Sequence, residues 1–265
     1  MKKLFLLLGL LSILSPAFTQ IGGISGSKLQ SYCVDVVDHH KQEFEPSFSI
    51  SKTNGYWDND GVKTDMFPNS NQYLLNTGMQ FRFTYGLWDK LEMGVSMASD
   101  LQSSDWGMRY IIQQKKNWGV ALIAGMKIPL GNRIVDPNST KIEDVGNFGF
   151  GLVGSYTFSD RLSLDVTTQA GLYNKKLIPA HYGNYFFNTD LGYYIFNKQL
   201  QLIGGFGYQG MYFEGEDRQL FTFYPGFTAE TGDHFLFVMG VPISLHGKNI
   251  ENLLGFNFAL TITLD

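Results

Sequence analysis

A strict two-residue alternation of apolar and polar side chains constrains this chain more than any other feature. It is clearest in residues 72–85, where one face carries Tyr73, Leu75, Thr77, Met79, Phe81, Phe83 and Tyr85 and the other Gln72, Asn76, Gln80, Arg82 and Thr84. Successive side chains of a β-strand point to opposite faces, so this pattern predicts a strand between an apolar and a polar environment. A tilted strand of this length is long enough to cross a bilayer.

The same period recurs along the rest of the chain. Candidate strands lie near residues 43–52, 72–85, 91–98, 105–114, 118–128, 147–158, 162–172, 184–196, 199–212, 219–229, 235–243 and 253–264. Their number is even, as in bacterial outer-membrane barrels made of one chain. The sequence therefore predicts an all-β fold, an antiparallel transmembrane outer-membrane β-barrel of about 12 strands.

The connections between these segments alternate in length. Short turns are expected at Trp88-Asp89-Lys90, Lys115-Lys116-Asn117, Ser159-Asp160-Arg161, Asn197-Lys198 and Thr231-Gly232-Asp233. Longer polar loops are expected at 53–71, 99–104, 129–146, 173–183, 213–218 and 244–252. Strict alternation of this kind predicts short periplasmic turns and longer extracellular loops.

Residues 1–19 have the organisation of a secretory signal peptide. Lys2 and Lys3 precede an apolar stretch from Leu4 to Leu14, and small residues follow near Thr19. The expected domains are the signal peptide at 1–19, a periplasmic N-terminal arm or partial plug at 20–41, and the barrel at 42–265. The expected location is the outer membrane of a Gram-negative bacterium.

Composition supports a membrane barrel over a soluble one. Charged residues make up 17% of the chain and aromatic residues 15%, and the net charge of -4 argues against a nucleic-acid partner. Tyr and Trp lie at the ends of the apolar faces, as the aromatic girdles of membrane barrels do. The alternative is a soluble periplasmic barrel that binds a lipid-like ligand, in which the apolar face would be an interior core.

Three segments resemble a known family. The motifs are Y-G-L-x-D-x-L-E at residues 85–92, K-I-P-L-G at 127–131 and Y-x-F-S-D-R-L-S-L at 156–164. They are similar to hairpins of the outer-membrane transporter family of the MetA pathway of phenol degradation. The resemblance covers the chain from about residue 44 onward. It implies passage of hydrophobic or aromatic compounds across the outer membrane, and it carries no catalytic residues.

The histidines do not form an enzyme site in the sequence. Ser244 and His246 fall in an expected loop, so we expect no catalysis, no cofactor and no metal. His39 and His40 adjoin Asp35 and Asp38, but neighbours on an extended chain point opposite ways. A solvated polar stretch is therefore favoured over a metal site.

The polar faces of the strands yield the candidate lumen residues. Counted from the turn at Lys115-Lys116-Asn117, Gln114 opposes Trp118 and Asp105 opposes Lys127, which predicts a cross-strand lumen ion pair. Such charges either form an electrostatic constriction or neutralise one another. The candidate solute-contact residues are Arg82, Arg109, Phe186 and Tyr194.

The sequence thus predicts an outer-membrane barrel for passive uptake of small hydrophobic or aromatic compounds, which leave through the lumen or sideways into the bilayer. Its expected partners are outer-membrane lipid, such solutes and the outer-membrane assembly machinery. The remaining alternative is a structural or adhesive barrel with a closed lumen.

Overall fold

The structure is a computed structural model that describes residues 21–26, 28–68, 71–101, 103–130, 146–173, 181–196, 199–232 and 234–264. The described residues contain fourteen strands. They are β1 (Gln42–Trp57), β2 (Lys63–Asp65), β3 (Leu74–Trp88), β4 (Leu91–Ala98), β5 (Ser103–Gln114), β6 (Trp118–Pro129), β7 (Asn147–Ser159), β8 (Leu162–Tyr173), β9 (His181–Ile195), β10 (Leu200–Phe213), β11 (Glu216–Thr231), β12 (Phe235–Gly240), β13 (Ile243–Lys248) and β14 (Ile250–Leu264). Among these same residues, no helix is long and apolar enough to cross a membrane.

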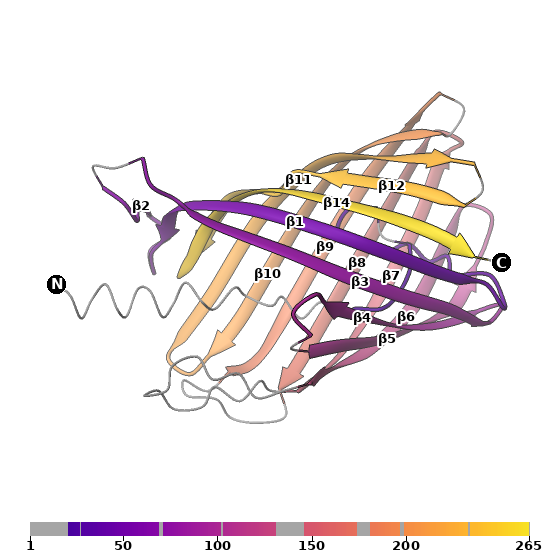
Figure 1. The fold of residues 1–265 in the computed structure, drawn as a ribbon, viewed down its shortest axis with the longest axis horizontal. Helices are drawn as coiled ribbons and strands as arrows, with labels where there is room; N and C mark the ends of the chain where they lie inside the picture. The colour runs from indigo at the N-terminus through magenta and orange to yellow at the C-terminus, as the bar shows by residue number, and fades with distance from the viewer. Residues whose placement is uncertain are drawn as a thin grey trace.

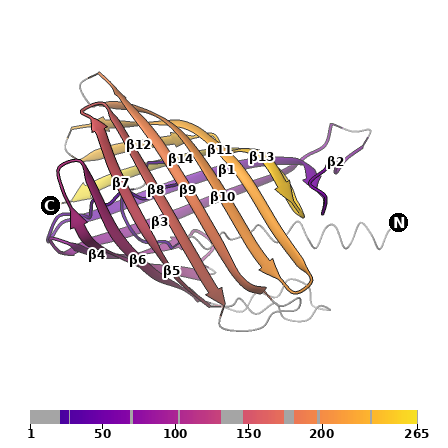
Figure 2. The ribbon, with the colours of Figure 1, turned by 180° about the vertical axis from the view of Figure 1, so that it is seen from behind.

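The strands close into an antiparallel barrel (Figures 1 and 2). Each main strand pairs with its neighbours in the chain, and β1 pairs with both β3 and β14. Closure leaves no free sheet edge in the bilayer, where an unpaired backbone group would be costly. The beginning of β1 faces the end of β14, with Gln42 opposite Leu264, so both lie at the same end of the barrel.

The fourteen strands form a barrel wall of twelve, because β2 lies outside the wall and β12 and β13 count as one. Short β2 pairs only with the end of β1 among the pairings of the described strands, and it projects from one end of the barrel (Figure 1). β12 and β13 are two parts of one strand, because Gly240 opposes Gly226 and Ile243 opposes Phe223 in one unbroken register. The predicted barrel of about 12 strands is therefore confirmed.

The break between β12 and β13 falls at Pro242, which has no N–H to donate to the ladder. Two backbone bonds still join the wall there. Val241 N donates to the Pro225 carbonyl at 2.9 Å, and Gly255 N donates to the Pro242 carbonyl at 2.9 Å. The wall therefore stays closed across the break.

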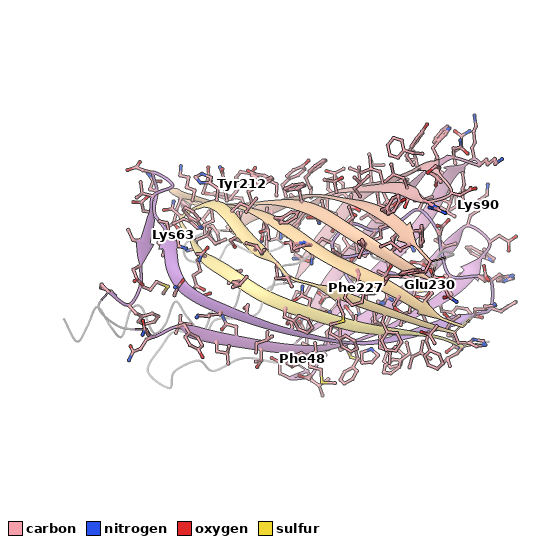
Figure 3. The ribbon with its side chains drawn as sticks, turned by 90° about the horizontal axis from the view of Figure 1, so that it is seen from above. Phe48, Lys63, Lys90, Tyr212, Phe227 and Glu230 are labelled. Atoms are coloured by element: carbon pink, nitrogen blue, oxygen red, sulfur yellow. The ribbon has the colours of Figure 1, made fainter. Side chains whose placement is uncertain are left out.

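The outward face is apolar and the inward face is polar, as the alternation predicts. Leu122 is 48% exposed on the outside, whereas Arg109 and Glu92 are completely buried inside. Figure 3 shows Phe48 and Tyr212 on the outside of the barrel, and Lys63 and Lys90 at its opposite ends. This inverted arrangement suits a wall with lipid outside and polar groups inside, and it excludes the soluble barrel.

The predicted alternation of turn lengths is only partly right. The short turns at Trp88-Asp89-Lys90, Lys115-Lys116-Asn117 and Ser159-Asp160-Arg161 are confirmed by the strand bounds. The long loops expected at 213–218 and 244–252 are wrong, because β10 and β11 are separated by two residues and β13 and β14 by Asn249 alone. Most of the loops expected at 129–146 and 173–183, and the signal peptide, lie outside the described residues.

Both errors have the same physical cause. Gly215 has a φ of 81° and Asn249 a φ of 51°, which are left-handed conformations that suit tight turns. The beginnings of β11 and β14 beside them carry consecutive polar side chains, Glu216 to Gln219 and Glu251-Asn252, so the alternation is lost there in the sequence. Their backbone ladder nevertheless continues, because hydrogen bonding between strands does not depend on side-chain polarity.

Candidate functional site: the barrel lumen

The described part of the N-terminal arm (residues 21–26 and 28–41) lies inside the barrel. In Figure 1 the indigo segment is seen between the walls, toward the end that carries the C-terminus. The arm makes hydrogen bonds to side chains of β3, β4, β5, β7, β8 and β9. The lumen is therefore built from two parts, the barrel wall and this arm.

A row of glycines receives the beginning of the arm. Gly94, Gly107, Gly125, Gly149 and Gly171 lie opposite one another on five consecutive strands, β4 to β8. A Cβ at Gly94 would collide with the carbonyl oxygen of Gly23, and one at Gly107 with that of Gly22. Only glycine allows the two backbones to approach this closely.

Aliphatic side chains hold the arm against the wall beside this row. Ile21, Ile24, Tyr32 and Val34 of the arm form one buried cluster with four wall residues of β5, β6 and β7, which are Ile111, Ala121, Ile123 and Val153. Each of the eight side chains is at most 7% exposed. The arm is thus packed like a protein core and is not a loose strand in a water-filled pore.

The Glu92 carboxylate of β4 joins both halves of the arm to the wall. It accepts hydrogen bonds from Ser25 N (2.8 Å), Ser25 Oγ (2.5 Å) and Val37 N (2.8 Å), and Arg109 Nη2 of β5 lies 2.9 Å away. Arg109 also donates to the Cys33 carbonyl at 2.7 Å. Because the pair is fully buried, each charge depends on the other for its stability.

Arg82 of β3 forms a second charged contact with the arm. It donates to the Ile24 carbonyl at 2.5 Å and lies 2.9 Å from Glu45 and 3.3 Å from Glu43, both on β1. Glu45 stands directly opposite Arg82 in the sheet. Arg109 Nη2 also donates to Ser25 Oγ at 2.7 Å, so the two arginines bind neighbouring residues of the arm, Ile24 and Ser25.

Two further carboxylates need the arm, because Asp165 of β8 and Asp190 of β9 stand directly opposite each other. Like charges in that arrangement destabilise a sheet. Lys28 Nζ lies 2.8 Å from Asp165, and the backbone N–H groups of residues 29, 30 and 31 all donate to Asp190 Oδ2 at 2.8–3.1 Å. Three converging N–H groups form a small anion-binding concavity.

The other two candidate residues lie on β9 and face inward. Phe186 is 5% exposed and stands between Gln169 and Gln209 on the neighbouring strands. Tyr194 is half-buried and opposes Gln201. The structure thus brings Arg82 and Arg109 together around the arm but places Phe186 and Tyr194 on another part of the wall. The solute-contact role of all four stays a prediction.

The predicted partners Asp105 and Lys127 stand opposite each other in the sheet. Lys127 is buried, with 9% of its surface exposed. The related expectation that Gln114 opposes Trp118 is wrong, since a bulge between Ile111 and Gln113 shifts Gln114 opposite Gly119. The ion pair itself stays a prediction.

His39 and His40 lie where the arm leaves the lumen and passes over β3. Their rings stack at 3.8 Å, and His40 Nδ1 is 2.9 Å from the Tyr85 hydroxyl. Among the described residues, no group of three or more His, Cys, Asp or Glu side chains could hold a metal ion.

The sequence interpretation missed Glu92, Asp165 and Asp190 as residues that bind the arm. Glu92 stands directly opposite Arg109. The predicted bounds of 91–98 and 105–114 would have placed Glu92 opposite Ile111, because β5 begins two residues earlier than expected. The partners of Asp165 and Asp190 are backbone N–H groups and Lys28 of the arm. Since the arm has no strand period, no register count could have placed it.

Several solved outer-membrane proteins share the barrel fold of this chain. The chain has the fold of the COG4313 outer membrane channel from Pseudomonas putida F1, at 13% identity and a TM-score of 0.71 over 87% of this chain and 98% of the channel. It is also similar to the NanC porin (7%, TM-score 0.53, 84% and 99%) and to a deletion mutant of the TodX monoaromatic hydrocarbon channel (8%, 0.51, 91% and 97%). Identities this low show the fold alone.

No protein of curated function matches the chain. A family model described as "Membrane bound beta barrel domain (DUF5777)" matches residues 48–245. That match confirms the resemblance drawn from the hairpin motifs at the level of a membrane-bound β-barrel of the outer-membrane type. The chain belongs to the family of membrane-bound β-barrel domains known as DUF5777.

Proposed function

We propose that this barrel mediates passive uptake of small, uncharged hydrophobic or aromatic compounds across the outer membrane. Passage of the solute needs no cofactor and involves no catalysis. The solved structures with this fold include an outer membrane channel and a monoaromatic hydrocarbon channel, which supports passage of solutes as the general role. The outward apolar face would contact lipid, and assembly would use the common outer-membrane machinery.

The charge arrangement in the lumen is the observation that carries this proposal. Arg82, Arg109 and Lys28 each lie within 3.3 Å of a carboxylate. A pore for anionic solutes needs cations that are free to bind them. These three cations are already neutralised, so the lumen favours solutes without charge.

We further propose that residues 20–41 act as a partial plug. The buried cluster and the contacts of Glu92, Asp165 and Asp190 support this role, because they fill the part of the lumen between β3 and β9. A solute would enter from the extracellular loops and pass when the arm moves. The extent of the packing also favours the rival function, a structural or adhesive barrel whose lumen never opens.

Uptake by proteoliposomes separates these two functions. Purified barrel is reconstituted into vesicles whose outer leaflet is lipopolysaccharide, which resists apolar solutes that cross plain phospholipid. The flux of radiolabelled toluene is compared with that of glucose and of benzoate. The proposal predicts protein-dependent flux of toluene above that of benzoate and glucose. Toluene flux equal to that of protein-free liposomes would leave the closed barrel as the better function. Faster flux of benzoate would refute the charge argument.

A further inference from the structure

An aliphatic patch on the inner wall differs from the rest of the lumen. Ile111 opposes Ala121, and Ala121 opposes Val153, so three side chains form a row across β5, β6 and β7, with Ile123 beside them. The buried lumen side chains of β8 and β9 are instead mostly polar, and include Asp165, Thr167, Gln169, Asn184, Asn188 and Asp190. A polar pore has no need of an aliphatic patch.

The floor next to this patch is nearly flat. Gly125 is the neighbour of Ile123 on the same face of β6, and Gly151 is the neighbour of Val153 on β7. Gly151 stands directly opposite Ile123. Glycine exposes the backbone itself, so the wall is low at these two positions. In the seated state Ile21 of the arm lies over Gly125, and the wall residue Gln169 lies beside Gly151.

The arm covers this patch with side chains of the same chemistry. Tyr32 is the one aromatic residue among residues 21–37, and its ring is 7% exposed in the cluster. The backbone around it binds polar groups at the edge of the patch. Tyr32 N donates to Thr167 Oγ1 at 2.8 Å, and Val34 N donates to Ser155 Oγ at 2.9 Å.

We infer that this patch is the solute-binding surface of the barrel, and that the arm competes with solute for it. The ligand class is an uncharged molecule with one ring, with or without a hydroxyl group, because the Tyr32 side chain is such a group and already fits. When the arm leaves, the oxygens of Thr167 and Ser155 lose the N–H groups that they accept from and can accept a hydrogen bond from a solute hydroxyl, while Ser155 keeps its own bond to Asp165. This inference rests on the proposed function and adds a site to it.

The way the arm is held suits an occupant that can be displaced. Apart from the cluster, its contacts are separate hydrogen bonds and ion pairs, among them those to Glu92, Arg109, Asp165, Asp190 and Thr167. Its attachment to the barrel is a short turn in which Lys41 N donates to the Asp38 carbonyl at 2.9 Å. A ligand that binds only the arm-free state shifts the population toward that state.

Cys33, the single cysteine of the chain, reports the position of the arm. Cys33 is half-buried in the lumen. Loss of hydration there raises the pKa of its thiol to about 12, so the seated arm offers little thiolate for reaction. The experiment measures the rate at which a water-soluble maleimide labels Cys33 in the full-length barrel in detergent. The added molecules are 4-methylphenol, which reproduces the Tyr32 side chain, and glucose as a polar control.

The expected result is saturable acceleration of labelling by 4-methylphenol and no effect of glucose. If 4-methylphenol leaves the labelling rate unchanged up to its solubility limit, the inference is overturned. In that case the patch only anchors the arm.

Two variants that both loosen the arm make the test sharper. Asp190→Asn weakens the three backbone contacts of the arm but leaves the patch intact, whereas Val153→Thr places a hydroxyl in the patch. Both are expected to label faster than wild type without solute. Asp190→Asn should then need less 4-methylphenol for half-maximal labelling, and Val153→Thr should need more.

If both variants need less 4-methylphenol than wild type for half-maximal labelling, the inference is overturned, because the solute then acts at another site. Val120→Thr is the matched control. It lies next to Ala121 on β6 but points outward, and it should behave as wild type. If Val153→Thr already labels at the limiting rate, equilibrium dialysis of radiolabelled 4-methylphenol replaces the titration. Weaker binding than to wild type supports the patch, and equal binding refutes it.

These results can be told apart from failure of the proposed function. If toluene flux is absent but 4-methylphenol displaces the arm, the binding site stands and transport does not. If toluene flux is present and the Val153→Thr variant keeps the wild-type flux and labelling, transport stands and the patch is not its site.

Discussion

Neighbouring residues of one strand in this barrel have opposite environments. On β5, Met108 is 49% exposed while Arg109 is completely buried. On β4, Glu92 is completely buried between two partly exposed apolar neighbours, Leu91 and Met93. A soluble domain would show the reverse, with apolar side chains inside and charges outside.

The difference shows that the two faces are stabilised by different means. The outer face depends on the solvent around it, which must be lipid. The inner face depends on the arm, because its charges are paired with one another and with arm groups. Changes to the inner face should therefore affect the arm, and changes to the outer face should depend on depth in the bilayer.

The largest expected effect is on the inner face. Glu92→Ala removes the partner of buried Arg109 and should destabilise the barrel by about 3–5 kcal/mol, the usual cost of leaving a buried charge unpaired. Urea unfolding in lipid vesicles, followed by tryptophan fluorescence, measures it. Asp38→Ala breaks an exposed ion pair with Lys41 and should cost about 0–1 kcal/mol. Similar small losses in both variants would contradict the role of Glu92.

The outer face should show a gradient with depth. Phe81→Arg and Leu122→Arg, both near mid-strand, should cost roughly 2–4 kcal/mol, the cost of a cation near the bilayer midplane. Tyr85→Arg and Trp106→Arg, nearer the strand ends, should cost about 0–1 kcal/mol. Equal large losses at all four positions would mean that the apolar face does not meet lipid.

A matched inward change sharpens this gradient. Gln80 adjoins Phe81 on β3 but faces the lumen, where its side chain bonds Ser96 at 2.9 Å. Gln80→Arg should therefore cost far less than Phe81→Arg in the same unfolding measurement. A larger loss for Gln80→Arg would reverse the assignment of the two faces.

The smallest effect is expected for a single contact of the arm. Ser155→Ala removes the acceptor of Val34 N and a donor to Asp165, and should weaken arm binding by about 1 kcal/mol. That corresponds to roughly a fivefold faster labelling of Cys33 when the arm opens rapidly and labelling is slow. Thr168→Ala, on the outer face of β8, should leave the labelling rate as in wild type. An equal increase in both variants would indicate a general loosening.

The strands could be predicted from the sequence because a wall between lipid and polar groups imposes a period of two. Residues 72–85 show this best. Asp105 and Lys127 are opposed as predicted because the bulge between Ile111 and Gln113 cancels the one-residue error at the turn. Strand ends beyond the bilayer, such as those beside Asn249, lack the period and were missed. The arm was also beyond prediction, since its partners are set by long-range contacts such as Ser31 N with Asp190.

The central claim is that the lumen is a passage closed by the arm, and planar-bilayer conductance tests it most directly. A variant that lacks residues 21–37, shown to be folded by its heat-dependent shift on gels, is compared with wild type and with Asp190→Asn. We predict a clearly higher conductance for the deletion, with Asp190→Asn opening in brief events at a wild-type baseline. A folded deletion variant with the wild-type conductance would contradict the claim and show that the barrel is closed by something other than the arm.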